Sequence, residues 1–116
     1  MKKLEELLNS TPEKIEFDRV MQVIEENYNY TPTSFTNGHG DMQVTNEAGS
    51  NEGSCKIFSF AQLNNLNEKQ TLACFGNYYR EDVLAHPENT DHANIRNFMQ
   101  SGWAGIHFDG IALTEK

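Results

Sequence analysis

The run from Cys55 to Leu63 most limits how this chain can fold, because it is the densest apolar stretch in the sequence. Its apolar residues lie too close together for an amphipathic helix with a wide polar face. The run is therefore either a buried helix or a buried strand. We favour a helix, since Ala61–Asn64 continues a helical composition. The preceding stretch, Asn46–Ser54, contains no large apolar residue and predicts a loop.

Two helices are predicted before this run. Leu4, Leu7 and Leu8 have helical spacing and predict a short helix that ends near Asn9. A longer helix should begin at the start signal 11–13 and end within 27–32. Its apolar face consists of Phe17, Val20, Met21, Ile24 and Tyr28.

Another helix is predicted to begin at Asn67, a residue type that favours the N-cap position. Gln70 stands at the capping-box position, and 86–87, a His-Pro pair, should end the helix. Its apolar face consists of Leu72, Phe75, Gly76, Tyr79 and Val83.

The last predicted helix is capped by Thr90 or Asp91 and ends where Gly102 suits the left-handed position after a helix. Trp103 should then pack on Phe98, as residues do at such helix ends. The predicted buried face consists of Ile95, Phe98 and Met99.

Two segments alternate between apolar and polar residues around a turn, which predicts β-hairpins. One spans 33–45 with a turn at Asn37–Gly40, and the other spans 106–113 with a turn at Asp109–Gly110. The second is the strongest hairpin signal in the chain. We therefore expect a single α+β domain over residues 1–116, with four or five helices packed with two short β-hairpins. The hairpins could join in one sheet.

The charge balance bears on partners and compartment. The formal net charge is −8, from 17 acidic and 9 basic residues, and a chain of this sign repels nucleic acid and anionic membranes. Glu5 and Glu6 interrupt the apolar stretch that a signal peptide needs, and no run is long enough to span a membrane. Cys55 and Cys74 form no disulfide framework and are expected to be reduced thiols. We expect a soluble, cytoplasmic protein with no nucleic-acid or membrane partner.

No complete cofactor or metal motif is present. The segment 49–56 resembles a phosphate-binding P-loop only faintly, because its lysine does not directly follow the second glycine. The four histidines include no pair at i, i+4 spacing. Asp91 and His92 are sequence neighbours, so we expect them on different sides of a helix. The prediction is no cofactor and no metal.

Cys55 is a candidate nucleophile, because the first turn of a helix lowers the pKa of a thiol. It also begins the densest apolar run, which favours an inert core thiol. Cys74 is a weaker candidate nucleophile than Cys55.

Polar residues of the kinds that bind ligands gather near the ends of the predicted segments. Loop amides and a helix N-terminus supply directional donors, arginine supplies charge and tyrosine a flat wall. We therefore hypothesise that the Asn46–Lys56 loop and the Asp91–Asn97 helix start meet at one polar cleft for a small polar ligand, with Tyr79 and Arg80 nearby. The predicted site residues are Asn46, Glu47, Asn51, Ser54, Lys56, Tyr79, Arg80, Asp91, His92 and Arg96. Glu47 and Asp91 could add acid/base function if burial raised their pKa. The alternative is that Arg80 and Arg96 only tie helices together through carboxylates.

Long stretches of the chain resemble the HopJ type III effector family. The resemblance runs from Phe17 to Thr114 and rests on the motifs N-E-x-G-x-N-x-G-S-C-K-I-F and T-D-H-x-N-I-R-N-F-M. It implies a bacterial protein, and the family name implies possible export by type III secretion. It supplies no activity, cofactor, partner or catalytic residue. Export of this type usually relies on a polar, flexible N-terminus, whereas this chain begins K-K-L-E-E-L-L, which prefers a helix.

Three classes of function follow. The first is a small-ligand binding domain or an enzyme of undescribed activity, because the polar groups are concentrated in a few motifs. The second is a protein-interaction module or exported effector, because of the family name. The third is a hydrolase that depends on Cys55.

Overall fold

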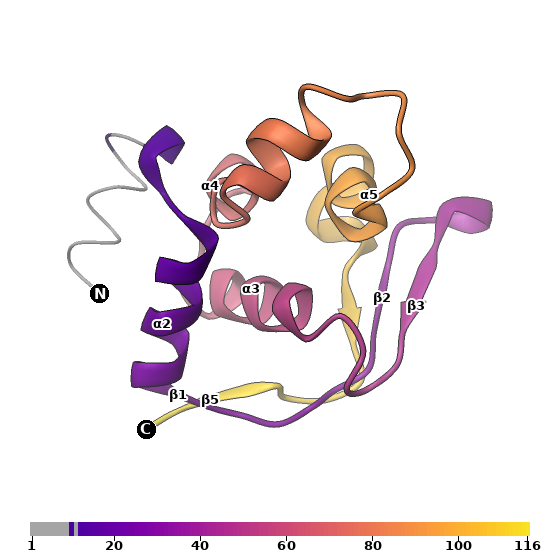
Figure 1. Ribbon diagram of the computed structural model, residues 1–116. Helices are drawn as coiled ribbons and strands as arrows, with labels where there is room; N and C mark the ends of the chain where they lie inside the picture. The colour runs from indigo at the N-terminus through magenta and orange to yellow at the C-terminus, as the bar shows by residue number, and fades with distance from the viewer. Residues whose placement is uncertain (1–9, 11) are drawn as a thin grey trace.

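A computed structural model of the protein describes residue 10 and residues 12–116. Helices surround a central helix and two small antiparallel sheets lie at the edge of the molecule, which confirms the predicted α+β class (Figure 1). The predicted helix of Leu4–Asn9 and the start signal at Thr11 lie outside the described residues. Among the helices that the structure describes, none has the length and apolar character needed to cross a membrane.

The apolar run forms the central helix α3 (Glu52–Leu63), as favoured from the sequence. Helix α3 lies between α4 and α5 on one side and the strands β1 and β5 on the other (Figure 1). Phe58 is completely buried, and its ring contacts four aromatic rings from other parts of the chain. The surrounding core draws on each described α-helix and on four of the strands, so α3 organises one shared core.

Helix α2 (Phe17–Asn27) is shorter than the predicted helix. Pro12–Lys14 forms a separate 3-10 turn, η1, and Ile15 lies buried between the two elements. Val20 and Ile24 are buried as their spacing predicts. The chain leaves the helix at Tyr28 and enters strand β1 (Tyr28–Tyr30), which the sequence analysis did not predict.

The first predicted hairpin is confirmed. Strands β2 (Phe35–Asn37) and β3 (Val44–Asn46) pair antiparallel, with Phe35 opposite Asn46, and the 3-10 turn η2 (Gly40–Met42) connects them. Strand β4 (His107–Phe108) joins the other edge of β2, which gives the order β3-β2-β4.

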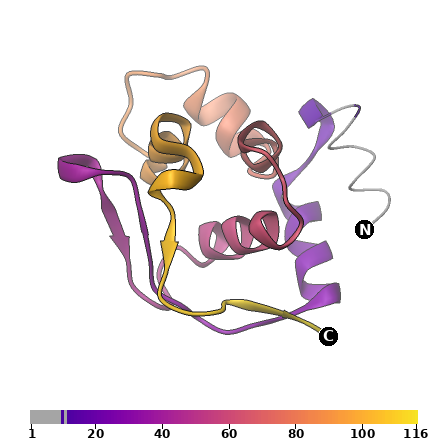
Figure 2. The same ribbon diagram turned by 180° about the vertical axis from the view of Figure 1, so that it is seen from behind.

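The second predicted hairpin is wrong. Strands β4 and β5 (Leu113–Glu115) do not pair with each other, because β4 pairs with β2 and β5 with β1. The segment 106–115 runs beside 28–36, with β4 upright next to β2 and β5 along the base of the molecule next to β1 (Figure 2). Between the strands, the Asp109 amide donates to the Ser34 carbonyl and the Thr31 amide donates to the Ala112 carbonyl. These bonds to the earlier segment replace the ones that a local hairpin would make.

The helix predicted from Asn67 begins as expected but is broken. Asn67 caps α4 (Glu68–Ala73), and both bonds of the capping box with Gln70 are present. At Gly76 the backbone turns to a φ of 60°, and a Cβ atom there would lie 2.7 Å from the Phe17 amide nitrogen. The chain then continues as a π-helical turn, η3 (Tyr78–Val83). A side chain at position 76 would both strain the backbone and collide with α2.

Helix α5 (Ala93–Ser101) is capped by neither Thr90 nor Asp91. His92 holds the N-cap position in a left-handed conformation, with a φ of 52°. Gly102 has a positive φ, although its ψ of −153° is not left-handed helical, and it leads into the 3-10 turn η4 (Gly102–Gly105). Trp103 packs on Phe98 with ring centroids 5.0 Å apart, as predicted.

Met99 was predicted to be buried but is 44% exposed. Helix α5 instead buries Asn94 and Asn97 beside Ile95 and Phe98. The prediction failed because it took only apolar residues for the inner face, whereas two asparagines belong to that face.

Candidate functional site

The starts of α3 and α5 face one cleft of about 450 Å³. Helix α3 contributes Asn51, Gly53 and Ser54, and the start of α5 contributes His92, Ala93, Asn94 and Ile95. The remaining wall consists of Phe17, Val44, Phe75 and Tyr78. None of these lining residues is acidic, although the chain as a whole carries an excess of acids.

Both helices begin at this cleft without a side-chain cap. Their N-cap residues, Asn51 and His92, are left-handed, and neither side chain accepts a hydrogen bond from its helix. The first amide groups of a helix have no acceptor within the helix, and its dipole makes this end partly positive. Two such ends at one cleft supply donors suited to an anionic group.

A buried network of asparagine side chains supports the cleft. Asn46 accepts hydrogen bonds from Asn51 and Asn94, at 2.7 and 2.8 Å, and its amide nitrogen donates to Asn94 at 3.1 Å. Asn94 also accepts a bond from Asn37 at 3.0 Å. These bonds tie strands β2 and β3 and the start of α3 to the start of α5. Asn46 therefore lies behind the cleft wall as a support and is 1% exposed.

The structure places the predicted site residues in several locations. Asn51, Ser54 and His92 line the cleft, whereas Glu47 is exposed and does not line it. Lys56 lies elsewhere, with its ammonium 4.7 Å from the centre of the Tyr30 ring.

Tyr79 and Arg80 do not belong to the cleft. They line a separate cavity of about 290 Å³, and Arg80 donates to the Ile15 carbonyl at 2.7 Å. Tyr78 takes the place predicted for Tyr79, and its ring centre lies 5.2 Å from that of His92. The break at Gly76 explains the shift, because the prediction assumed one continuous helix through this segment.

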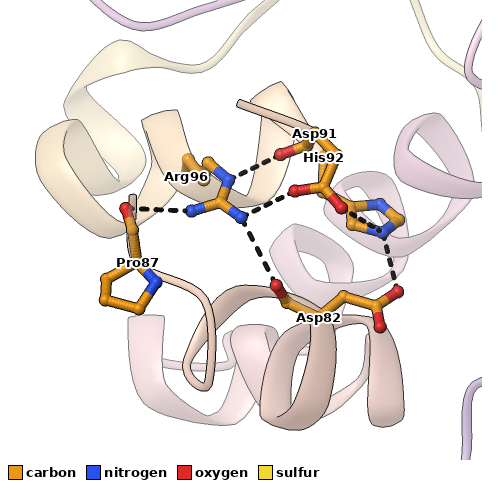
Figure 3. Close-up of polar contacts among 5 residues, drawn as sticks. All are labelled: Asp82, Pro87, Asp91, His92 and Arg96. Atoms are coloured by element: carbon orange, nitrogen blue, oxygen red, sulfur yellow. Dashed lines mark hydrogen bonds and ion pairs between the residues drawn. The ribbon is translucent and has the colours of Figure 1, made fainter. Parts of the chain in front are cut away.

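Asp91 and Arg96 lie next to the cleft. Arg96 donates to the Asp91 carboxylate at 2.7 Å and to the backbone carbonyls of Asp82, Pro87 and Asp91 (Figure 3). The side-chain bond from Arg96 lowers the pKa of Asp91, so Asp91 lacks the raised pKa that an acid/base role would need. Arg96 ties the loop before α5 to that helix through three backbone carbonyls as well as through one carboxylate, the kind of contact that the structural alternative proposes.

The expectation that Asp91 and His92 point to different sides of a helix is wrong. Both residues precede the first helical residue, Ala93. His92 Nε2 lies 3.8 Å from the Asp91 carboxylate and 3.0 Å from that of Asp82. The rule for neighbouring helical residues therefore does not apply to this pair.

Sequence reasoning missed two residues of this region. Asn37 was assigned to a turn, and Asn94 was not among the individual site residues although it lies inside the predicted helix start 91–97. Both are buried. The signal that was available is the number of asparagines next to short strands and helix starts, where a buried amide can satisfy backbone and side-chain partners together.

The two thiols have features of core residues. Burial raises the pKa of Cys55, whose sulfur lies 3.5 Å from the Thr33 carbonyl oxygen, and burial raises the pKa of Cys74 to about 12. A raised pKa lowers the thiolate fraction at neutral pH, so nothing in this arrangement favours a nucleophile.

This arrangement predicts slow alkylation of both cysteines. At pH 8 the folded protein should react with iodoacetamide at least roughly tenfold more slowly than the protein in urea, because both thiols are buried and protonated. Mass spectrometry of timed samples measures the rate at each site, and the urea sample is the control. Rapid labelling of Cys55 in the folded protein would contradict the interpretation.

One comparison with known proteins shows the family of this chain, and another finds a similar solved structure. The family model described as HopJ type III effector protein matches residues 1–113. The solved structure titled "Crystal structure of unknown function protein VPA0580" is 57% identical in sequence, covers 100% of this chain and 93% of its own, and superposes with a TM-score of 0.94. No curated protein matches the sequence significantly.

Proposed function

The chain belongs to the HopJ type III effector protein family, and we propose that it binds a small molecule with a carboxylate or phosphate group in the cleft between α3 and α5. The observation that carries this proposal is the convergence of two uncapped helix N-termini on one cleft. Each supplies unpaired amide donors and a partial positive charge.

The other lining groups also favour a ligand with an anionic group. Ser54 and Asn51 add a hydroxyl and an amide, and the half-buried His92 adds a ring nitrogen that can donate a hydrogen bond. Because no carboxylate lines the cleft among the described residues, an anion entering it meets donors and no lining acid.

The aromatic side chains of the cleft suit the uncharged part of the ligand. Phe17 and Tyr78 meet edge to face with ring centres 5.0 Å apart. With Phe75 they form the aromatic part of the cleft wall. A volume of about 450 Å³ lies in the range of small-molecule sites. We therefore infer a ligand with an anionic end and a compact apolar or planar body.

A pair of matched variants tests the anion site. Ser54→Glu places a negative charge in the cleft, whereas Ser54→Gln adds nearly the same volume without charge. Titration with inorganic phosphate and with benzoate, followed by amide NMR, should shift the Gly53, Ser54, Ala93 and Asn94 signals of the wild type. Like charges about 4 Å apart near a protein surface repel by about 4 kcal/mol, so the glutamate variant should lose at least roughly tenfold in affinity.

The glutamine variant should stay within about threefold of the wild type, since it adds volume but no repulsion. Equal losses in the two variants would show that the site does not select for negative charge. Shifts that arise only at residues outside the cleft would place the anion elsewhere.

The second candidate is a protein-interaction module or exported effector. The description of the matching family favours it, as does a cavity of about 350 Å³ beside the exposed side chains of Met42, Leu84 and Met99. A secretion assay in bacteria with and without a working type III system tests export of the full chain. Absence of the protein from the medium in both strains would argue against this function.

We also infer that the protein has no nucleic-acid or membrane partner, because its net charge of −8 opposes both surfaces. The free thiols of Cys55 and Cys74 favour the cytoplasm, a reducing compartment, as the place where it acts. The third candidate, a Cys55-dependent hydrolase, gains no support from a buried thiol with a raised pKa.

A further inference from the structure

Two carboxylates and one imidazole meet beside the cleft, and we propose that Asp82, Asp91 and His92 bind a divalent transition-metal ion such as Zn²⁺ (Figure 3). One oxygen from each aspartate and one ring nitrogen of His92 all lie within 4.8 Å of one another. This inference does not depend on the proposed anion site, because the metal alone can serve as the probe.

The spacing of these atoms fits a metal ion. Zinc ligands lie about 2.0–2.2 Å from the ion, so two ligands at tetrahedral angles are about 3.3–3.6 Å apart. The His92 nitrogen lies 3.0 Å from the Asp82 oxygen and 3.8 Å from the Asp91 oxygen, on either side of that range. The aspartate side chains are about half exposed, at 48% and 51%, so the small adjustment needed meets little packing resistance.

Arg96 holds the candidate site in place. It binds one oxygen of Asp91 at 2.7 Å and so leaves the other oxygen toward His92. Its remaining bonds reach the carbonyls of Asp82, Pro87 and Asp91, which fixes the loop that brings the ligands together. Supporting contacts of this kind orient the ligands of metal sites.

The local charge remains suitable for a cation. With a neutral imidazole, the two aspartates and Arg96 sum to one negative charge. A mixed set of imidazole nitrogen and carboxylate oxygen suits transition ions, whereas Mg²⁺ and Ca²⁺ prefer oxygen ligands alone. Three protein ligands leave a coordination position for water. His92 also lines the cleft, so that position lies close to it.

The competing account is an ion-pair network without metal. In that account the His92 nitrogen only donates its proton to Asp82 at 3.0 Å. Metal binding requires that nitrogen to be unprotonated, so the two accounts exclude each other at this atom. Binding measurements with Zn²⁺ therefore decide between them.

Isothermal titration of metal-free protein with ZnCl₂ should give saturable binding of one ion per chain. Asp82→Asn and His92→Asn should each weaken it by at least about tenfold, because each removes a carboxylate or imidazole ligand and even the loss of a contact that orients a ligand costs about 10–100-fold. Asparagine tolerates the left-handed backbone of position 92, so the second variant should fold. His107→Asn is the matched control, since this exposed histidine lies outside the cluster and should leave binding unchanged. MgCl₂ should bind much more weakly than ZnCl₂.

Thermal unfolding gives a second readout. Excess Zn²⁺ should raise the melting temperature of the wild type and of His107→Asn but not that of His92→Asn, because only a folded-state site stabilises by mass action. The proposal fails if no saturable binding occurs, if His92→Asn binds as tightly as the wild type, or if His107→Asn alone abolishes binding.

Discussion

Replacing Phe58 by alanine is expected to lower the free energy of unfolding by about 3–5 kcal/mol, the range for deletion of a buried phenylalanine ring. Phe58 is 0% exposed. Its ring centre lies 5.0–6.3 Å from those of Phe35, Phe75, Phe98 and Trp103. These rings come from β2, η4, α5 and the turn after α4, so the cavity would weaken contacts between several elements at once. Small domains have a total stability of about 5–15 kcal/mol, and the variant should be close to unfolding.

Urea denaturation followed by circular dichroism measures this effect. Gln62→Ala is the matched control, since Gln62 is exposed on the same helix and its loss should change stability by no more than about 0.5 kcal/mol. A loss below about 1.5 kcal/mol for Phe58→Ala would mean that the core closes around the cavity and that α3 is not its centre.

Asn46→Ala should cost about 2–4 kcal/mol although the residue is small and polar. Asn46 accepts bonds from Asn51 and Asn94 and donates to Asn94. Removing its side chain leaves the buried Asn94 amide without these partners, and each unsatisfied buried polar group costs about 1–3 kcal/mol. Urea denaturation measures the loss.

Asn89→Ala serves as the control for this experiment. Asn89 is an exposed loop residue, so its truncation should change stability by at most about 0.5 kcal/mol. If Asn46→Ala were equally mild, water would be replacing the missing side chain, and the asparagine network would not be what holds the start of α5 against β3.

Features set by neighbouring residues could be predicted from the sequence. The apolar run gives α3, Asn67 with Gln70 gives the start of α4, and the pairing of Trp103 with Phe98 follows from the end of α5. Each depends on contacts within a few positions of the chain. Local chemistry decides such features before any distant partner is in place.

The strand partners of the C-terminal segment could not be predicted. An Asp-Gly turn between alternating residues favours a hairpin, but β4 and β5 find better partners in β2 and β1. The stacked rings of Phe35 and Phe108, 5.0 Å apart, are one contact that stabilises the pairing of β4 with β2. A contact between residues so far apart in the sequence leaves no periodic signal.

Predictions about the candidate site likewise differ according to whether they depend on local or on long-range contacts. The expectation that the loop before α3 and the start of α5 would supply binding groups matches the location of Asn51, Ser54 and His92, and their role in binding stays a prediction. Tyr79 and Arg80 were misplaced because the break at Gly76 depends on the close approach of α2. That approach is a tertiary contact, and a glycine in an apolar pattern does not reveal it.

The pairing of 106–115 with 28–36 also sets an order of events during synthesis. Strand β1 and the outer edge of β2 are made early, yet their partners are among the last residues of this sequence to be added. At about 5–20 residues per second, Tyr30 waits roughly 4–17 s for Leu113 to be joined to the chain. Throughout that interval these backbone edges can pair with other chains. Helices α3, α4 and α5 are synthesised within this interval, while β1 and one edge of β2 still lack their partners, and the risk of such misassembly lasts until β5 is added.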